Sequence, residues 1–116
     1  MALTGATGFI GRVLCTQLLA AGHSVHALYR PRADRVVTDA PRLQWIPGDL
    51  DDASALGRLV AGCEGVIHCA GAVRGGRRAD FDRVNESGVL RMVQAALNGG
   101  CRRFLLLSSL AARASE

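Results

Sequence analysis

The sequence predicts an α/β fold, a doubly wound parallel sheet with helices on both faces and the strand order 3-2-1-4-5. Two observations support this. Short apolar runs alternate with segments whose apolar residues recur at helical spacing, a pattern typical of parallel sheets. Right-handed crossovers then leave few topologies for such a chain. With 116 residues, the chain is long enough for one domain with one core.

Strands are expected at residues 2–4, 24–30, 43–47, 65–71 and 103–109. Residues 31–42 contain prolines and charges, so we expect a loop there. His68 falls in the middle of the fourth strand, where we expect a core histidine with its hydrogen bonds satisfied, not a catalytic base.

Three helices are expected between these strands. The first has a stripe formed by Ile10, Val13, Leu14, Leu18 and Ala21, and Gly22 suits its C-terminal cap. The second spans residues 53–61, with Asp52 as its cap and Leu56, Leu59 and Val60 directed inward. The third is long and ends at Gly99–Gly100; its apolar positions are Phe81, Val84, Val89, Met92, Val93 and Ala96.

Composition argues against several classes of protein. All positive charges are arginines, the net charge is only +4 and aromatic residues are scattered, so we expect no nucleic-acid partner. No apolar run approaches the ~20 residues of a membrane span, and no signal peptide is visible, so we expect a cytoplasmic protein without a membrane partner. The four cysteines lack metal-ligand spacing, which predicts buried thiols and no metal site.

The stretch TGATGFIG (residues 4–11) carries three glycines three residues apart, between a predicted strand and a predicted helix. A phosphate-binding turn requires this context, because a helix N-terminus presents unpaired N–H groups and a partial positive charge. Glycine also removes the Cβ that would hold a pyrophosphate away from the backbone. A tight turn without a ligand is the alternative that this stretch alone leaves open.

Four later stretches accompany the glycine turn: GDLDD (48–52), VIHCAGAVRG (66–75), FDRVNESG (81–88) and RFLLLSSLAA (103–112). Taken in order with TGATGFIG, they resemble motifs of the short-chain dehydrogenase/reductase superfamily, in particular its extended and atypical branches, the NAD-dependent epimerase/dehydratase group. The resemblance implies a Rossmann-type, NAD(P)-binding domain over residues 1–116. Both ends look cut, so we expect the N-terminal part of a longer enzyme whose later strands and substrate-binding region lie outside this sequence.

The resemblance implies cofactor contacts at three places. Pyrophosphate would lie at Gly5, Thr7, Gly8 and Gly11, with backbone N–H groups from Phe9 and Ile10. Adenine would lie at Leu50 and Asp49, whose carboxylate would accept from the amino group. Adenosine and ribose would lie beside Ala70, Gly71 and Ala72. Two alternatives stay open: a loop in which Asp51 or Asp52 caps the next helix, and a strand end whose small residues let a helix pack closely.

Arginines at the end of the second strand predict NADP(H), with NAD as the alternative. An acidic residue there would bind the ribose hydroxyls of NAD. Instead the chain has Arg30, with Arg32 and Arg35 close behind, and a guanidinium suits a 2′-phosphate through bidentate, charge-assisted bonds. Arg12 is a second candidate on the phosphate side. The alternative is that these arginines only face solvent.

The resemblance assigns catalytic roles to Ser109, which would hydrogen-bond the carbonyl or hydroxyl of a small-molecule substrate, and to Asn85, which would support the proton relay. A helical asparagine bonded to local backbone is the alternative for Asn85. The family's Tyr-x-x-x-Lys pair is absent, because the single tyrosine is Tyr29 and the chain has no lysine. We therefore expect an oxidoreductase or epimerase/dehydratase that is inactive as this chain alone. Two further alternatives are a non-catalytic NADP(H) sensor and a structural nucleotide-binding subunit.

The last predicted strand, with its run FLLLSS, would form an apolar sheet edge. Such an edge can pair with another chain, so we also expect self-association.

Overall fold

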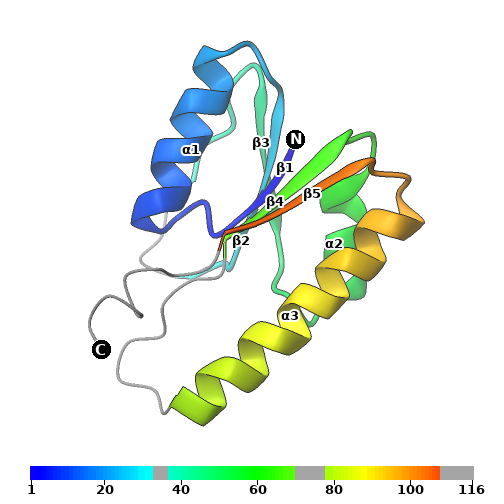
Figure 1. Ribbon diagram of the computed structural model, residues 1–116. Coiled ribbons are helices and arrows are strands. Elements are labelled where there is room, and N and C mark those ends of the chain that lie inside the picture. Colours follow the sequence, from blue (N-terminus) through cyan, green and yellow to red (C-terminus); the bar gives the residue numbers. More distant parts are fainter. Residues whose placement is uncertain (33–36, 70–77, 108–116) are drawn as a thin grey trace.

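The computed structural model describes residues 1–32, 37–69 and 78–107; the side chains of residues 78–86 also lie outside the described part. Five strands form one parallel sheet in the order β3-β2-β1-β4-β5, which confirms the predicted fold class (Figure 1). The central strand β1 (Ala2–Thr4) pairs with β2 (Val25–Tyr29) and β4 (Gly65–Cys69). Within the described residues, the outer strands of the sheet are β3 (Leu43–Pro47) and β5 (Arg103–Leu107).

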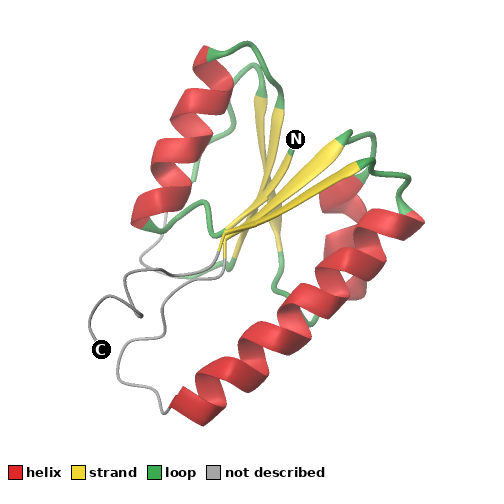
Figure 2. Cartoon of the chain, viewed as in Figure 1, coloured by secondary structure: helices red, strands yellow, loops and turns green. Residues whose placement is uncertain are grey.

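Helices cover both faces of the sheet, as a doubly wound fold requires (Figure 2). One face carries α1 (Phe9–Ala20), and the other carries α2 (Ala53–Val60) and α3 (Arg78–Asn98) (Figure 1). Because side chains alternate along a strand, neighbouring residues of β1 serve different halves of the core. Leu3 packs in the cluster under α1, and Ala2 packs in the cluster formed with α2 and α3. In the described part of the chain, no helix has both the length and the apolar content needed to cross a bilayer.

The apolar stripe predicted for α1 is wrong in part. Ile10 is 56% exposed and Val13 is 44% exposed, whereas the buried positions of the helix are Gly11 and Cys15. The cause is the close approach of Gly11 to the backbone of the preceding turn, which rotates the helix so that residues 11 and 15 face the sheet. A pattern of apolar side chains cannot reveal a contact made by a glycine.

The predicted helix ends are confirmed. After α1, the N–H of His23 bonds the carbonyl of Leu18 at 3.0 Å and that of Gly22 bonds Leu19 at 3.1 Å, the paired bonds of a Schellman motif. At the start of α2, a carboxylate oxygen of Asp52 accepts from the N–H of Ala55 at 3.1 Å. The first of these caps ends α1 just before β2, and the second sets where α2 begins.

Candidate functional site

A cleft of about 520 Å³ lies at the carboxyl ends of the strands, the position where open α/β sheets bind ligands. Its volume falls within the usual range of small-molecule and cofactor sites. The walls come from the ends of β1 and β2, the loop after β3, the end of β4 and one face of α3. Five of the predicted cofactor residues line it: Gly5, Thr7, Arg30, Asp49 and Leu50.

Two of the three glycines in the first turn are required by the fold itself. Gly5 has φ +70°, and a Cβ there would lie 2.8 Å from the Cβ of Cys69 and 3.0 Å from its carbonyl oxygen. At Gly11 a Cβ would lie 2.6 Å from the carbonyl carbon of Gly5 and 2.8 Å from the Cα of Ala6. These two glycines let the turn, β4 and α1 approach one another, so they say nothing by themselves about a ligand.

Gly8 differs from its two neighbours in the motif. Its φ of −79° suits any residue, and the nearest atom to an added Cβ, the carbonyl oxygen of Gly5, would be 3.4 Å away. Gly8 is the exposed N-cap of α1 and provides no side-chain cap. The N–H of Arg12 donates to the carbonyl oxygen of Gly8, which is the first hydrogen bond of α1. The amides of Phe9, Ile10 and Gly11 come before this bond. Open space beside unpaired amides is what a bound phosphate requires.

Gly8, Phe9, Ile10 and Gly11 do not line the cleft, although they directly follow Thr7, which does. Arg12 turns back on the same motif, since its Nε donates to the carbonyl oxygen of Thr7 at 3.1 Å. Arg12 also lines a second cavity, between α1 and β3, together with Cys15 and Trp45. Arg12 therefore braces the turn in this structure.

The loop after β3 is organised by its own acidic residues. One carboxylate oxygen of Asp49 accepts from the N–H of Asp51 at 2.8 Å, and Asp52 caps α2. The capping role that the sequence left open between Asp51 and Asp52 thus belongs to Asp52. Asp49 and Leu50 are half-buried and face the cleft, and a carboxylate has enough lone pairs to accept a further bond there.

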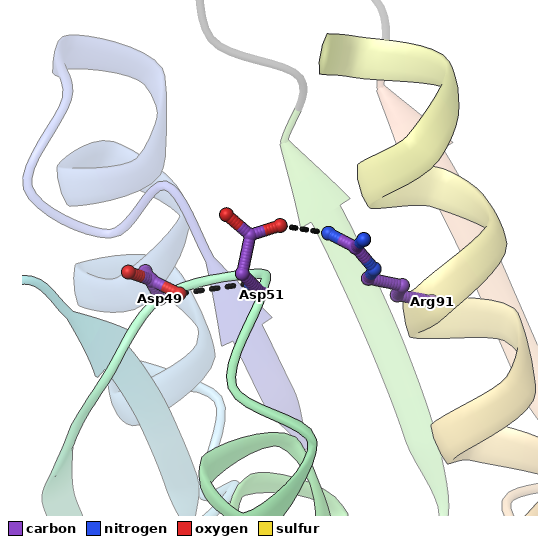
Figure 3. Close-up of polar contacts among 3 residues, drawn as sticks. All are labelled: Asp49, Asp51 and Arg91. Carbon is purple, nitrogen blue, oxygen red and sulfur yellow. Dashed lines mark hydrogen bonds and ion pairs between the residues drawn. The ribbon is translucent and has the colours of Figure 1, made fainter.

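The wall formed by α3 was missed in the sequence. Ser87, Gly88 and Arg91 line the cleft from one face of this helix. A Cβ at Gly88 would lie 2.8 Å from Cδ1 of Leu50, so the helix and the loop are in close contact. Next to this contact, Arg91 reaches from α3 to form an ion pair with Asp51 (Figure 3). Helical spacing after the predicted Asn85 could have pointed to residues 88 and 91, but not to their partners.

His68 occupies the core, as expected. Its Nδ1 is 2.6 Å from the hydroxyl oxygen of Thr4, which also accepts from the N–H of Cys69 at 3.1 Å. Burial lowers the pKa of His68. A neutral, hydrogen-bonded imidazole in the middle of the sheet serves packing and not proton transfer in the cleft.

Several predicted site residues lie outside the described part of the chain, namely Arg35, Ala70, Gly71, Ala72 and Ser109. Asn85 lies in α3, but its side chain is likewise outside that part. Their assigned roles remain predictions. Arg30 and Arg32, in contrast, both lie in the cleft wall at the end of β2.

Comparison with known proteins gives relatives among reductases. Ceramide reductase from Caulobacter vibrioides is 39% identical over 113 residues, which are 97% of this chain and 35% of that protein. Divinyl chlorophyllide a 8-vinyl-reductase, chloroplastic, from Oryza sativa subsp. indica is 40% identical over 93% of this chain and 29% of its own length. The chain therefore spans about a third of the length of these curated relatives.

Solved structures show the same arrangement of strands and helices. Uronate dehydrogenase from Agrobacterium tumefaciens, in a variant complexed with NAD, superposes with a TM-score of 0.74 at 27% identity, over 92% of this chain and 39% of that one. Vestitone reductase from alfalfa gives a TM-score of 0.68 at 26% identity, over 90% and 34% of the two chains.

The match to a family model is more extensive than any single motif, since it covers residues 1–114. It includes the glycine turn, the loop after β3 and the face of α3 that together build the cleft. On this match, the chain belongs to the NAD dependent epimerase/dehydratase family.

Proposed function

We propose that this chain forms the NADP(H)-binding part of an oxidoreductase that acts on a carbonyl or hydroxyl group. Membership of the family supports a nicotinamide cofactor. The observation that carries the choice of NADP(H) is the position of Arg30, which lines the same cleft as Gly5 and Asp49. Reductases among the relatives favour hydride transfer to a substrate over epimerisation or dehydration.

The distribution of charge in the cleft supports a phosphate near β2. Arg30 and Arg32 follow that strand, whereas Asp49 and Asp51 follow β3. Asp51 is already paired with Arg91, which keeps its negative charge away from the β2 side of the cleft. A 2′-phosphate at the end of β2 would thus meet guanidinium groups, which bind phosphate with two parallel hydrogen bonds.

The proposed catalytic groups of this chain are Ser109, to bond the reacting oxygen of the substrate, and Asn85, to support the proton relay. No lysine occurs in the chain, and its one tyrosine, Tyr29, belongs to β2. A positioned acid–base group contributes about 10²–10⁴-fold to a rate. We therefore expect nucleotide binding but no turnover from these residues alone.

The proposal is tested by titrating NADPH and NADH into the wild-type chain and into Arg30→Asp by calorimetry. We expect the wild type to prefer NADPH. We expect the variant to lose about tenfold or more of its NADPH affinity, because charge-assisted hydrogen bonds contribute roughly 1.5–3 kcal/mol each. Arg102→Asp is the matched control, since it removes an exposed arginine at the other end of the sheet.

Two outcomes would contradict different parts of the proposal. If neither nucleotide binds the folded wild-type chain, the cofactor site itself is wrong. If both bind and Arg30→Asp behaves like Arg102→Asp, the site stands but the preference for NADP(H) is wrong.

The second candidate is a non-catalytic NADP(H) sensor or a structural nucleotide-binding subunit, which would use the same cleft for binding alone. Turnover of a carbonyl substrate with NADPH by the protein as its host makes it, lost on Ser109→Ala, would exclude both. We also propose a cytoplasmic location, where a reducing environment would keep the four cysteines as thiols.

A further inference from the structure

Two cysteines lie next to each other at the end of the sheet opposite the cofactor cleft. Gly65 and Arg103 are register partners at the start of β4 and β5, and each is preceded two residues earlier by a cysteine, Cys63 and Cys101. The two cysteines stand in the turns that lead into these paired strands, so the turns lie side by side where the strands begin. Neighbouring strands lie about 4.8 Å apart, within the Cα–Cα range of about 4.4–6.8 Å that disulfides span.

The contacts of the two side chains agree with this register. Sγ of Cys101 donates to the carbonyl oxygen of Cys63 at 3.2 Å. Sγ of Cys63 lies 3.4 Å from the carbonyl oxygen of Leu59 and 3.5 Å from Nδ1 of His26. Both cysteines pack against the same apolar cluster, formed by β-strand residues with α2 and α3.

The backbone holds both cysteines in place. The N–H of Cys101 closes the Schellman motif of α3 by bonding the carbonyl of Ala96 at 2.9 Å. The N–H of Cys63 bonds the carbonyl of Val60 at 2.9 Å, at the end of α2. Both cysteines therefore stand in anchored turns, with Sγ of Cys101 against the backbone of Cys63, and neither residue lines the cleft.

We propose that Cys63 and Cys101 form a redox-sensitive dithiol, which small-molecule disulfides oxidise to one intramolecular disulfide. Cys101 is the more exposed of the two, so its thiolate attacks the small disulfide and releases one small thiol. The thiolate of Cys63 then attacks the sulfur of Cys101 and releases the second small thiol. In sum, two protein thiols and one small disulfide give one protein disulfide and two small thiols.

The reaction is expected to be slow at neutral pH. Burial raises the pKa of both thiols, and the negative charge of a Cys63 thiolate raises the pKa of Cys101 further, while the positive charge of the N-terminal amine opposes both shifts in part. Because the thiolate is the attacking species, the rate should rise with pH. In a reducing compartment the pair stays reduced, and a shift of the small-thiol pool toward its disulfide forms the bond.

The bond would connect the turn before β4 to the turn before β5. It would close a loop over residues 63–101, which contains β4 and α3, and so lower the entropy of the unfolded chain. We expect the melting temperature to rise by more than about 5 °C on oxidation.

The test uses the double variant Cys15→Ser/Cys69→Ser, in which only the proposed pair remains. This protein is incubated with oxidised glutathione at several pH values, blocked with N-ethylmaleimide and analysed by intact mass and peptide mapping. We expect a single cross-linked peptide joining residues 63 and 101, with a higher melting temperature. The wild type should form the same bond, and Cys101→Ser should form none within the chain. If Cys101→Ser does not fold, Cys101→Ala serves instead.

Three results would overturn the proposal. One is that both thiols of the folded double variant stay open to alkylation after prolonged oxidation at alkaline pH. Another is that the wild type pairs Cys63 or Cys101 with Cys15 or Cys69. The third is that oxidation joins two chains instead of two residues of one chain. Nucleotide binding plays no part in these readouts, so they are independent of the function proposed above.

Discussion

The glycine turn offers a sharp test, because adding one methyl group should affect different properties at two of its positions. At Gly11 we expect a loss of stability, and at Gly8 a loss of NADPH affinity. In Gly11→Ala the new Cβ would lie 2.6 Å from the carbonyl carbon of Gly5 and 2.8 Å from the Cα of Ala6. Both are backbone atoms, so α1 must move away from the turn. Overpacking usually costs about 1–3 kcal/mol, and a clash with backbone belongs at the upper end, about 3 kcal/mol. A domain is stabilised by only about 5–15 kcal/mol in total.

At Gly8 the same methyl group meets nothing closer than 3.4 Å, and the backbone conformation is ordinary. Gly8→Ala should cost only the loss of an acceptable N-cap, about 0.5–1 kcal/mol. Gly8→Ser supplies a better cap and should leave stability unchanged or slightly higher. Both substitutions place a Cβ where a phosphate would approach the amides of Phe9 and Ile10, so we expect each to weaken NADPH binding at least about tenfold.

The assay combines two measurements on each variant. Urea denaturation, followed by the fluorescence of the half-buried Trp45, gives the free energy of unfolding. Calorimetric titration with NADPH gives the affinity of the folded protein. A Gly8→Ser variant that folds normally and binds NADPH as well as the wild type would refute a phosphate at this turn. A Gly11→Ala variant as stable as the wild type would refute the close approach of α1 to the turn.

Three other predictions follow from the described residues. Arg91→Gln should lower the free energy of unfolding by no more than about 1 kcal/mol, because the ion pair between Arg91 and Asp51 is exposed. The loss should be smaller in high salt, and urea denaturation at two salt concentrations measures it. Burial lowers the pKa of His68 from its ordinary value near 6.5, so below that pH the unfolded chain binds a proton that the folded protein excludes. Stability should therefore fall as the pH drops below about 6.5, by at most about 1.4 kcal/mol per pH unit, and His68→Gln should flatten this dependence. The wild-type chain should self-associate through the half-exposed edge strand β5, as measured by light scattering, and a monomeric wild type would contradict this prediction. Leu105→Lys should reduce the self-association more than the control Leu97→Lys, which changes an exposed position of α3.

The sequence alone determined the secondary structure and the strand order. Alternating periods of two and 3.6 residues are local properties, and so are the caps at Gly22 and Asp52, because each depends on residues within one turn of the chain. The chirality of parallel crossovers then left few topologies, and the order predicted among them is the observed one. The glycine turn and the end of the second strand pointed to Gly5 and Arg30 in the cleft wall, whereas Thr7, Asp49 and Leu50 were predicted from the family resemblance.

Only the tertiary structure decided the contacts between segments that are distant in sequence. Gly11 turns α1 by approaching Gly5, which reversed the expected burial of Ile10 and Val13. Ser87, Gly88 and Arg91 joined the cleft because α3 packs on the loop after β3, about forty residues earlier. Cys63 and Cys101 became neighbours through the register of β4 and β5. Periodicity describes which face of an element is apolar, but register and close backbone approach depend on how whole elements pack, and no local pattern encodes them.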